Sequence, residues 1–560
     1  MKRRAFIKNS LLGLAATTAF PSRIFSQSRK VDILIRGASV LDGLGNPAFG
    51  TDVLVRNGLI MEIGHFKKSV ARKVVDARGL YLAPGFIDMH SHSDDDIFLY
   101  PHAESKIYQG VTTEVTGNCG YSAAPVRGRD AGARMDSFHE DGITGTWSDV
   151  ASYRAALKKN GMALNQALLV GQGTLRKSIA GLEDRPLTPT ELEEEKAALE
   201  QALTQGAAGF STGLEYTPGT FTPTSELIEL ARVAARYDRL YATHMRDEEQ
   251  MLLAAISEAL TIGRESGVRV QISHLKANGK ANWSKQIDAL NMIEQAHADG
   301  VRVWIDAYPY TAYSTSLVAF LPAWSREGGN GALRERLQST ETREKILREL
   351  DAKVRGDLGG YDLIVISSTG NKAVKDIIGL SMKEIAAREQ MAENEALIDL
   401  LEKDNFSTGF VGHGMSPENV EMVLAHPLTM IGSDGVTQAP YGPAAKDRPH
   451  PRSYGTFARV LGYYCRERKI FDLPTAVKKM TSMPAAQLGL KKRGRIARGM
   501  RADLVLFDFD KVTDKATFSD PHQYATGFEY VFVNGRTVVE KGKINKALPG
   551  RLLDLNSRGV

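Results

Sequence analysis

Between residues 83 and 433 the sequence alternates eight short, apolar, β-branched runs with stretches of helical periodicity. The predicted strands cover residues 83–90, 111–117, 164–170, 207–212, 240–245, 268–274, 301–308 and 428–433. Helical periodicity is clearest at residues 189–205, 226–237, 248–264 and 285–297. Eight such units predict an α/β chain that closes into a TIM-like (β/α)8 barrel, rather than an open doubly wound sheet.

One connection in this pattern is much longer than the others. About 120 residues separate the seventh predicted strand from the eighth, with helices and a further strand-like run at 363–366. Loops at the C-terminal face of a barrel carry function. We therefore predict a catalytic barrel over residues 81–491 that holds an inserted lid over residues 315–427.

The two ends of the chain lack this alternation of strands and helices. Both have short β-branched runs and hairpin signals such as Asn57-Gly58 and Asn534-Gly535. Neither end is long enough to form a stable domain by itself. The economical interpretation is one small β-sandwich built from residues 29–80 and 492–560.

The first 28 residues have a basic head with Arg3-Arg4, a short apolar middle at 11–16 and small polar residues near Ser26. This leader resembles a twin-arginine export signal and predicts a periplasmic protein. An uncleaved anchor or an ordinary signal peptide is the alternative.

Charge and composition exclude several classes of protein. The formal net charge of +5 equals the five basic residues of the leader, which has no acid, so the remaining chain offers no basic excess for nucleic acid. No apolar run is long enough to span a bilayer, and we expect no stable membrane span after processing. Two cysteines in an exported chain do not make a disulfide scaffold.

Polar residues of the metal-ligand type follow five of the eight predicted strands. His90 and His92 alternate at the end of the first strand, so their side chains project to one face. A lone strand histidine is usually a satisfied core residue, and a lone cysteine is usually a small buried hydrophobe. Strand ends of a barrel converge on one mouth, however, so together these residues favour a metal site: His90, His92, Cys119, His244, His274 and Asp434.

These motifs resemble the amidohydrolase superfamily, and more narrowly its D-aminoacylases, the N-acyl-D-amino-acid deacylases. The broader resemblance is carried by the segments Pro84-Gly85-Phe86-Ile87-Asp88-Met89-His90-Ser91-His92, Gly110-Val111-Thr112-Thr113, His244, His274 and Ser433-Asp434. The narrower one is carried by Gly117-Asn118-Cys119-Gly120 and by the stretch from Gly432 through His450-Pro451-Arg452 to Gly455. The resemblance covers nearly the whole chain after the leader.

The resemblance implies a zinc ion held tightly by Cys119, His244 and His274, because D-aminoacylases place a cysteine where many relatives have a carboxylated lysine. It also implies a second, weaker metal position at His90 and His92, with Cys119 shared and Asp434 close by. Zinc with three protein ligands keeps a position open for water and lowers its pKa to about 7. Asp434 would take the proton of this water and pass it to the leaving nitrogen.

The same resemblance places Lys276, Tyr308, Ser314 and Arg452 around the substrate, where cations and hydroxyls suit the carboxylate of an amino acid. For Arg452 a plain surface position is the alternative, and for Tyr308 simple packing. The expected partner is a small-molecule substrate, and the oligomeric state is left open.

Three other functions compete with zinc-dependent hydrolysis of N-acyl-D-amino acids. A cyclic-amide hydrolase of the hydantoinase or dihydroorotase kind shares the fold and metal chemistry, but Cys119 in place of a carboxylated lysine argues against it. A hydrolase of D-configured dipeptides is nearer. A binding protein on an inactive barrel predicts missing ligands, whereas all six metal and base positions are filled.

Overall fold

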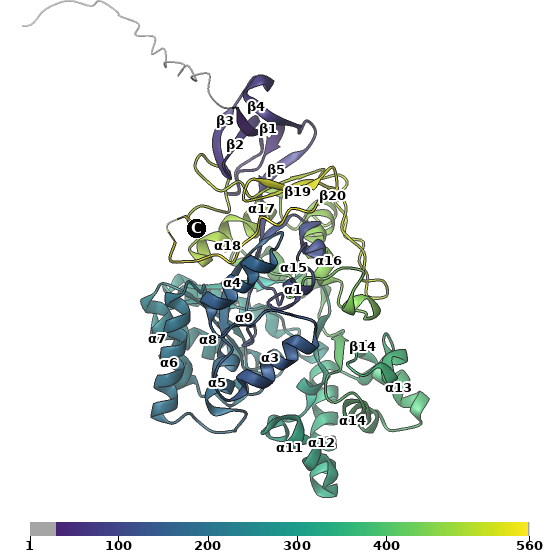
Figure 1. Ribbon diagram of the computed structural model, residues 1–560. Coiled ribbons are helices and arrows are strands. Elements are labelled where there is room, and N and C mark those ends of the chain that lie inside the picture. Colours follow the sequence, from purple (N-terminus) through teal and green to yellow (C-terminus); the bar gives the residue numbers. More distant parts are fainter. Residues whose placement is uncertain (1–29, 558) are drawn as a thin grey trace, which may run out of the picture.

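The computed structural model describes residues 30–557 and 559–560, so the predicted export signal at 1–28 lies outside the described residues. Figure 1 shows a β-sheet of terminal strands at one end, the barrel in the middle, and a helical insert on the side away from the terminal sheet. Within the described ranges, no helix has the length and apolarity needed to cross a membrane.

Eight parallel strands form the barrel in the order in which they occur along the chain. They are β6 (Phe86–Asp88), β7 (Val111–Thr116), β8 (Asn165–Gly171), β9 (Gly209–Gly213), β10 (Leu240–His244), β11 (Arg269–Ile272), β12 (Val303–Ala307) and β16 (Thr429–Ile431). The first and last strands meet through backbone hydrogen bonds, with Met89 N–H donating to the Ile431 carbonyl over 3.1 Å and Asp434 N–H donating to that of His90 over 2.8 Å. The predicted fold class is confirmed.

The helices between the strands include the four predicted ones, each within four residues of its predicted range, and two for which no range was predicted. They are α4 (Val150–Asn160), α5 (Gln172–Ala180), α6 (Pro189–Thr204), α7 (Thr224–Arg236), α8 (Leu252–Ser266) and α9 (Lys285–Ala298). The start of α6 shows how the sequence sets such a boundary. The Thr188 side chain accepts from Glu191 N–H, the Glu191 carboxylate accepts from Thr188 N–H, and Pro189 opens the first turn.

The first predicted strand, 83–90, divides between two sheets. Strand β5 (Tyr81–Pro84) pairs with the terminal strands, and only β6 belongs to the barrel. Gly85 separates them at a point where a Cβ atom would lie 2.3 Å from the side chain of Thr112. Glycine, which has no side chain, lets the backbone pass this close to Thr112 as the chain moves from one sheet into the other.

Strands from both termini join into one nine-stranded sheet with its own apolar core. Besides β5 it contains β1 (Val31–Val40), β2 (Phe49–Arg56), β3 (Leu59–Gly64), β4 (Ala71–Asp76), β17 (Leu504–Phe507), β18 (Phe528–Val533), β19 (Arg536–Glu540) and β20 (Lys543–Ile544). The final residues leave this sheet and bond to the barrel, where Leu553 N–H donates to the Gln166 carbonyl over 2.7 Å.

The insert is a separate layer with its own core and a three-stranded antiparallel sheet. Its elements are β13 (Tyr313–Ser316), α10 (Ala323–Arg326), α11 (Gly329–Gln338), α12 (Thr340–Lys353), β14 (Ile364–Ser368), α13 (Met382–Glu389), α14 (Glu393–Lys403) and β15 (Gly409–Gly412). It therefore spans 313–412 rather than the predicted 315–427. The next helix, α15 (Pro417–Ala425), buries Val420, Val423 and Leu424 in the barrel core and is the barrel's own seventh helix.

Candidate metal centre and active site

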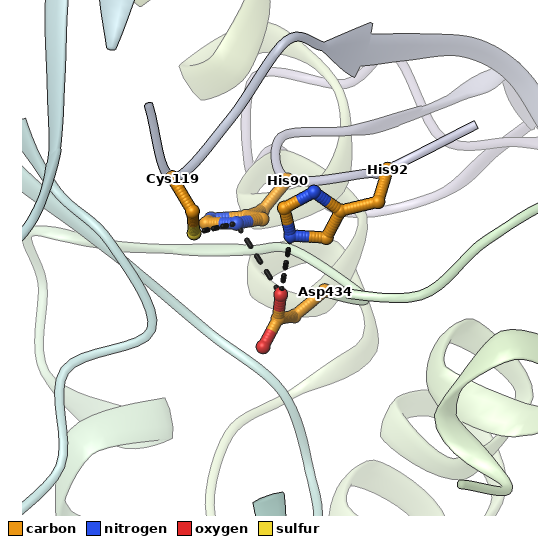
Figure 2. A group of neighbouring side chains, drawn as sticks. All are labelled: His90, His92, Cys119 and Asp434. Atoms are coloured by element: carbon orange, nitrogen blue, oxygen red, sulfur yellow. Dashed lines mark hydrogen bonds and ion pairs between the residues drawn. The ribbon is translucent and has the colours of Figure 1, made fainter. Parts of the chain in front are cut away.

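The six predicted metal and base residues meet at the C-terminal mouth of the barrel. Their ligand atoms form two groups that share one cysteine: His90, His92, Cys119 and Asp434 in the first, and Cys119, His244 and His274 in the second. Figure 2 shows the first group, with both imidazoles directed toward the Asp434 carboxylate and the Cys119 thiol beside the His90 ring. The structure thus brings together all the residues that the strand-end pattern selected.

In the first group, Asp434 lies between the two histidines. Its Oδ1 atom is 2.9 Å from His92 Nε2 and 3.4 Å from His90 Nε2. The Sγ atom of Cys119 is 3.3 Å from the same nitrogen of His90. Three donor types, imidazole, thiolate and carboxylate, therefore face one small volume.

In the second group, the Nε2 atom of His274 is the common neighbour. It lies 3.5 Å from Cys119 Sγ and 3.0 Å from His244 Nδ1. The side chains of His244 and His274 are almost fully buried, at 5% and 2% exposed. Two imidazoles and a thiolate at these separations are the donor set that zinc prefers.

Three of these residues have left-handed backbone conformations, which residues other than glycine rarely adopt: Cys119 at φ 51°, His274 at φ 33° and Asp434 at φ 52°. Before Cys119 the chain turns at Gly117, where φ is +77° and a Cβ atom would lie 1.9 Å from the Leu169 carbonyl oxygen. Such backbone strain is typical of functional sites. It turns the side chains inward immediately after their strands end.

In three of the histidines, the ring nitrogen that points away from the ligand cluster (the far nitrogen) contacts a supporting carboxylate. His90 Nδ1 lies 3.1 Å from Asp306, His274 Nδ1 lies 2.9 Å from Glu248, and His244 Nε2 lies 3.2 Å from Glu215. This arrangement fixes the tautomer and the ring orientation of metal-binding histidines. The sequence analysis missed all three acids, although Asp306 near the end of the seventh predicted strand fits the same strand-end pattern.

Electrostatics favour a thiolate at the centre of the cluster. Burial alone would raise the pKa of Cys119, but His90 and His274 outweigh it and hold that pKa well below its usual value. Since a thiolate is the form of cysteine that binds metals, the residues present fit a zinc ion.

Arg452 lies beside Asp434 rather than at the surface. Its NH1 group donates to Asp434 Oδ2 over 2.7 Å, and its NH2 group donates to the Ser314 carbonyl over 3.0 Å. Burial would raise the pKa of Asp434, yet Arg452 and the histidines lower it well below its usual value. In this state Asp434 is a carboxylate that can accept a proton.

The other predicted substrate residues lie around the same cavity, which has a volume of about 610 Å³. Lys276 lines it, with its Nζ atom 2.5 Å from Glu248, and Ser314 lines it from strand β13 of the insert. Tyr308 lies behind the wall, with its ring 5.1 Å from the Arg452 guanidinium and 5.9 Å from Lys276 Nζ. Tyr308 therefore supports the two cations.

A buried lysine beneath the mouth was also missed by the sequence analysis. Lys106 is fully buried, and its Nζ atom donates to Asp88 over 2.8 Å and to the Ser433 hydroxyl over 2.6 Å. Asp88 also accepts from Ser433 N–H over 2.7 Å. This network ties the first barrel strand to the last directly below His90 and Asp434.

Comparison with known proteins agrees with this geometry. The sequence profile of the amidohydrolase family matches residues 73–539. The chain is 37% identical to the N-acyl-D-aspartate deacylase of Alcaligenes xylosoxydans xylosoxydans, over 94% of this chain and 95% of that protein. It is 36% identical to the D-aminoacylase of the same organism, over 94% and 98% of the two chains.

A solved structure gives the same result in three dimensions. The N-acyl-D-glutamate deacylase of Bordetella bronchiseptica, crystallised with zinc and a phosphonate mimic of the tetrahedral intermediate, superimposes with a TM-score of 0.80. That match has 34% identity and covers 94% of this chain and 100% of the other. By profile, sequence and structure, the chain belongs to the amidohydrolase family and, within it, to the D-aminoacylase group.

Proposed function

We propose that the protein is a zinc-dependent deacylase that hydrolyses the amide bond of N-acyl-D-amino acids to a carboxylate and a free D-amino acid. The observation that carries the proposal is the shared cysteine, which joins two ligand groups beside a buried carboxylate at the wall of a cavity. Two relatives described above are deacylases of N-acyl-D-aspartate and N-acyl-D-glutamate, which supports the same substrate class.

Cys119, His244 and His274 would hold the tighter zinc ion, and His90 and His92 would hold a weaker one that shares Cys119. When bound, zinc supplies Lewis acidity toward the acyl carbonyl and lowers the pKa of water at the site. The supporting acids described above orient the histidine ligands and fix which ring nitrogen carries the proton.

Asp434 acts as the general base and then as the general acid. Its carboxylate takes one proton from the attacking water while the water oxygen bonds to the acyl carbon. Asp434 returns that proton to the amide nitrogen as the carbon–nitrogen bond breaks. The second proton of the water is released when the acid product ionises and is taken up by the amine, so the products are a carboxylate and an ammonium group.

The cations of the cavity select an acidic substrate end. Arg452 and Lys276 are both buried and charged, and both lie within the cavity wall near Asp434. A charge-assisted contact from Arg452 to the α-carboxylate would place the acyl carbon beside the metal ligands. The insert contributes Ser314 to the same wall.

A hydrolysis screen tests the proposal directly. Mature protein loaded with zinc is offered N-acetyl-D-amino acids, their L enantiomers, hydantoins and D-dipeptides, and release of free amine or ring opening is measured. We expect turnover of N-acetyl-D-amino acids to dominate and to disappear after zinc is removed by a chelator. Faster turnover of hydantoins or of D-dipeptides would replace the proposal with one of its rivals.

We also propose export by the twin-arginine route, on the strength of Arg3-Arg4 and the apolar run that follows. Replacing both arginines with lysine is expected to leave the precursor in the cytoplasm, whereas the unchanged protein accumulates in the periplasm. Equal periplasmic amounts of both proteins would assign the leader to another route.

A further inference from the structure

Glu215 and Tyr216, the second and third residues after strand β9, lie against a predicted zinc ligand. Glu215 Oε2 is 3.2 Å from His244 Nε2, and the centre of the Tyr216 ring is 4.7 Å from that of the imidazole. The other nitrogen of His244, Nδ1, faces His274 in the metal group. With Nδ1 as the ligand atom, Nε2 carries the proton and donates it to Glu215.

Residues of the insert contact the same two residues from the opposite side. Lys353, the last residue of α12, has its Nζ atom 3.0 Å from Glu215 Oε1, and Arg326 of α10 donates to the Glu215 backbone carbonyl over 3.0 Å. The Thr315 hydroxyl is 3.0 Å from that of Tyr216. Three insert residues, which lie 99 to 138 positions away in the sequence, thus bond to the segment that follows strand β9.

Both oxygens of Glu215 are therefore in use, one on the metal ligand and one on the insert. Lys353 also donates to the Ala319 carbonyl over 3.0 Å, which fixes its ammonium group within the insert. A movement of the insert that withdraws Lys353 would change both the position and the charge balance of the carboxylate that orients His244. The chain Lys353–Glu215–His244 joins the two parts by direct contacts only.

We propose that Glu215 is a positioning residue for His244, and that the Lys353–Glu215 ion pair couples docking of the insert to the affinity of the tight zinc site. A carboxylate on the far nitrogen of a metal-binding histidine orients the ring and raises its basicity. The coupling is reciprocal, so zinc binding also favours the docked insert. This inference depends on the zinc site of the proposed function.

Zinc affinity, measured by competition with a chromophoric chelator, tests the positioning role without relying on activity. Glu215→Gln is expected to weaken zinc binding about 10- to 100-fold, since loss of such a supporting carboxylate typically has that effect. Glu249→Gln is the matched control: Glu249 is another buried acid of the cavity wall, but it accepts from Asn278 over 2.7 Å and holds no histidine. We expect its zinc affinity to equal that of the wild type.

The coupling is tested by a double-mutant cycle on the same measurement. Lys353→Met should weaken zinc binding, Lys353→Arg should restore it, and Lys353→Met added to Glu215→Gln should have no further effect. Lys345→Met removes a lysine from the same helix that pairs with Glu349 instead, and should change nothing. Zinc should also slow proteolysis within residues 313–412 of the wild type more than in the Lys353→Met protein.

Each outcome separates the inference from the function on which it depends. Wild-type protein that neither retains zinc nor cleaves N-acyl-amino acids overturns both. Wild-type protein that does both, with unchanged zinc affinity in a folded Glu215→Gln variant, overturns the positioning role alone. Additive losses in the double mutant overturn the coupling.

Discussion

The two halves of the ligand cluster share Cys119 but are supported differently. On the side of His244 and His274, both imidazoles have a carboxylate on the far nitrogen and are at most 5% exposed. On the other side, His90 is held in the same way by Asp306, but His92 is 26% exposed and bonds to Asp434, a member of its own group.

In the half with His90 and His92, the carboxylate also pairs with a cation. Asp434 accepts from Arg452 on one oxygen and from His92 on the other. A fully supported site retains its metal, whereas a carboxylate with several partners can move a proton. We therefore propose that the half with His244 and His274 retains metal and that the half with His90, His92 and Asp434 transfers the proton.

The largest effect is expected from removing a ligand of the supported half. His274→Ala should empty the tight zinc site and reduce turnover to background, because only Cys119 and His244 remain. Metal content after dialysis, measured by atomic absorption, checks this. His92→Ala is the control in the other half and should retain about one zinc per chain. Stoichiometric zinc in the His274→Ala protein would reverse our assignment of the two halves.

A smaller effect is expected from neutralising the base. Asp434→Asn keeps the shape of the side chain but removes its proton-accepting charge, so kcat should fall roughly 10²- to 10⁴-fold. Zinc content should change little, since Asp434 is absent from the tight group. A change in KM with kcat preserved would instead make Asp434 a binding residue.

Arg452 is proposed to bind the substrate carboxylate, and its replacement should have a smaller effect than that of Asp434. A charge-assisted hydrogen bond is worth roughly 1.5–3 kcal/mol, so Arg452→Met should cost about 10- to 150-fold in kcat/KM on an N-acyl-D-amino acid. The matching primary amide, which has no carboxylate, should lose much less. Its remaining loss measures the contact between Arg452 and Asp434.

Two further results make this test decisive. Arg452→Lys keeps the charge but loses the paired contacts to Asp434 and the Ser314 carbonyl, so it should recover part of the activity on the acid. Equal losses on acid and amide in the Arg452→Met protein would mean that Arg452 does not recognise the carboxylate.

The barrel and its ligands could be predicted because their signals are local. Short apolar strands alternate with helices of clear periodicity. His244 ends its strand, and His90, His92 and His274 lie within four residues of the ends of theirs. The division of residues 81–88 between two sheets could not be predicted, since an apolar run does not say which neighbour it pairs with. It depends on the close approach of Gly85 to Thr112, where the chain passes from one sheet into the other.

The contacts between distant residues that support the site could not be predicted from the sequence either. Lys353 meets Glu215 across 138 residues, and Lys106 meets Ser433 across 327. Charged residues in helices and loops are mostly solvated, so nothing in the sequence separates these from their exposed neighbours. Asp306 is different, because it occupies a predicted strand next to its end, and a search for acids as well as histidines would have found it.

Replacing Asp306 should have the smallest effect on metal binding, but it best separates the two halves. Of the three supporting acids, only Asp306 contacts both of them. Its Oδ1 atom accepts from the His274 backbone N–H over 2.8 Å and lies 3.1 Å from His90 Nδ1. Asp306→Asn keeps an oxygen for the backbone contact but loses the negative charge that favours a proton on His90 Nδ1. We expect the weaker metal to bind about 10-fold less tightly, with the tight zinc unchanged.

Asp306→Ala completes the comparison. It removes the acceptor altogether and leaves the buried N–H of His274 without its partner, a loss of about 1–3 kcal/mol. Both halves should therefore loosen in this variant, whereas only the weaker one should respond to Asp306→Asn. Titration with cobalt, whose thiolate absorption reports each site, distinguishes the two patterns. Release of the tight zinc by Asp306→Asn would show that the two halves bind metal as one unit, because the charge on Asp306 would then be felt equally by both.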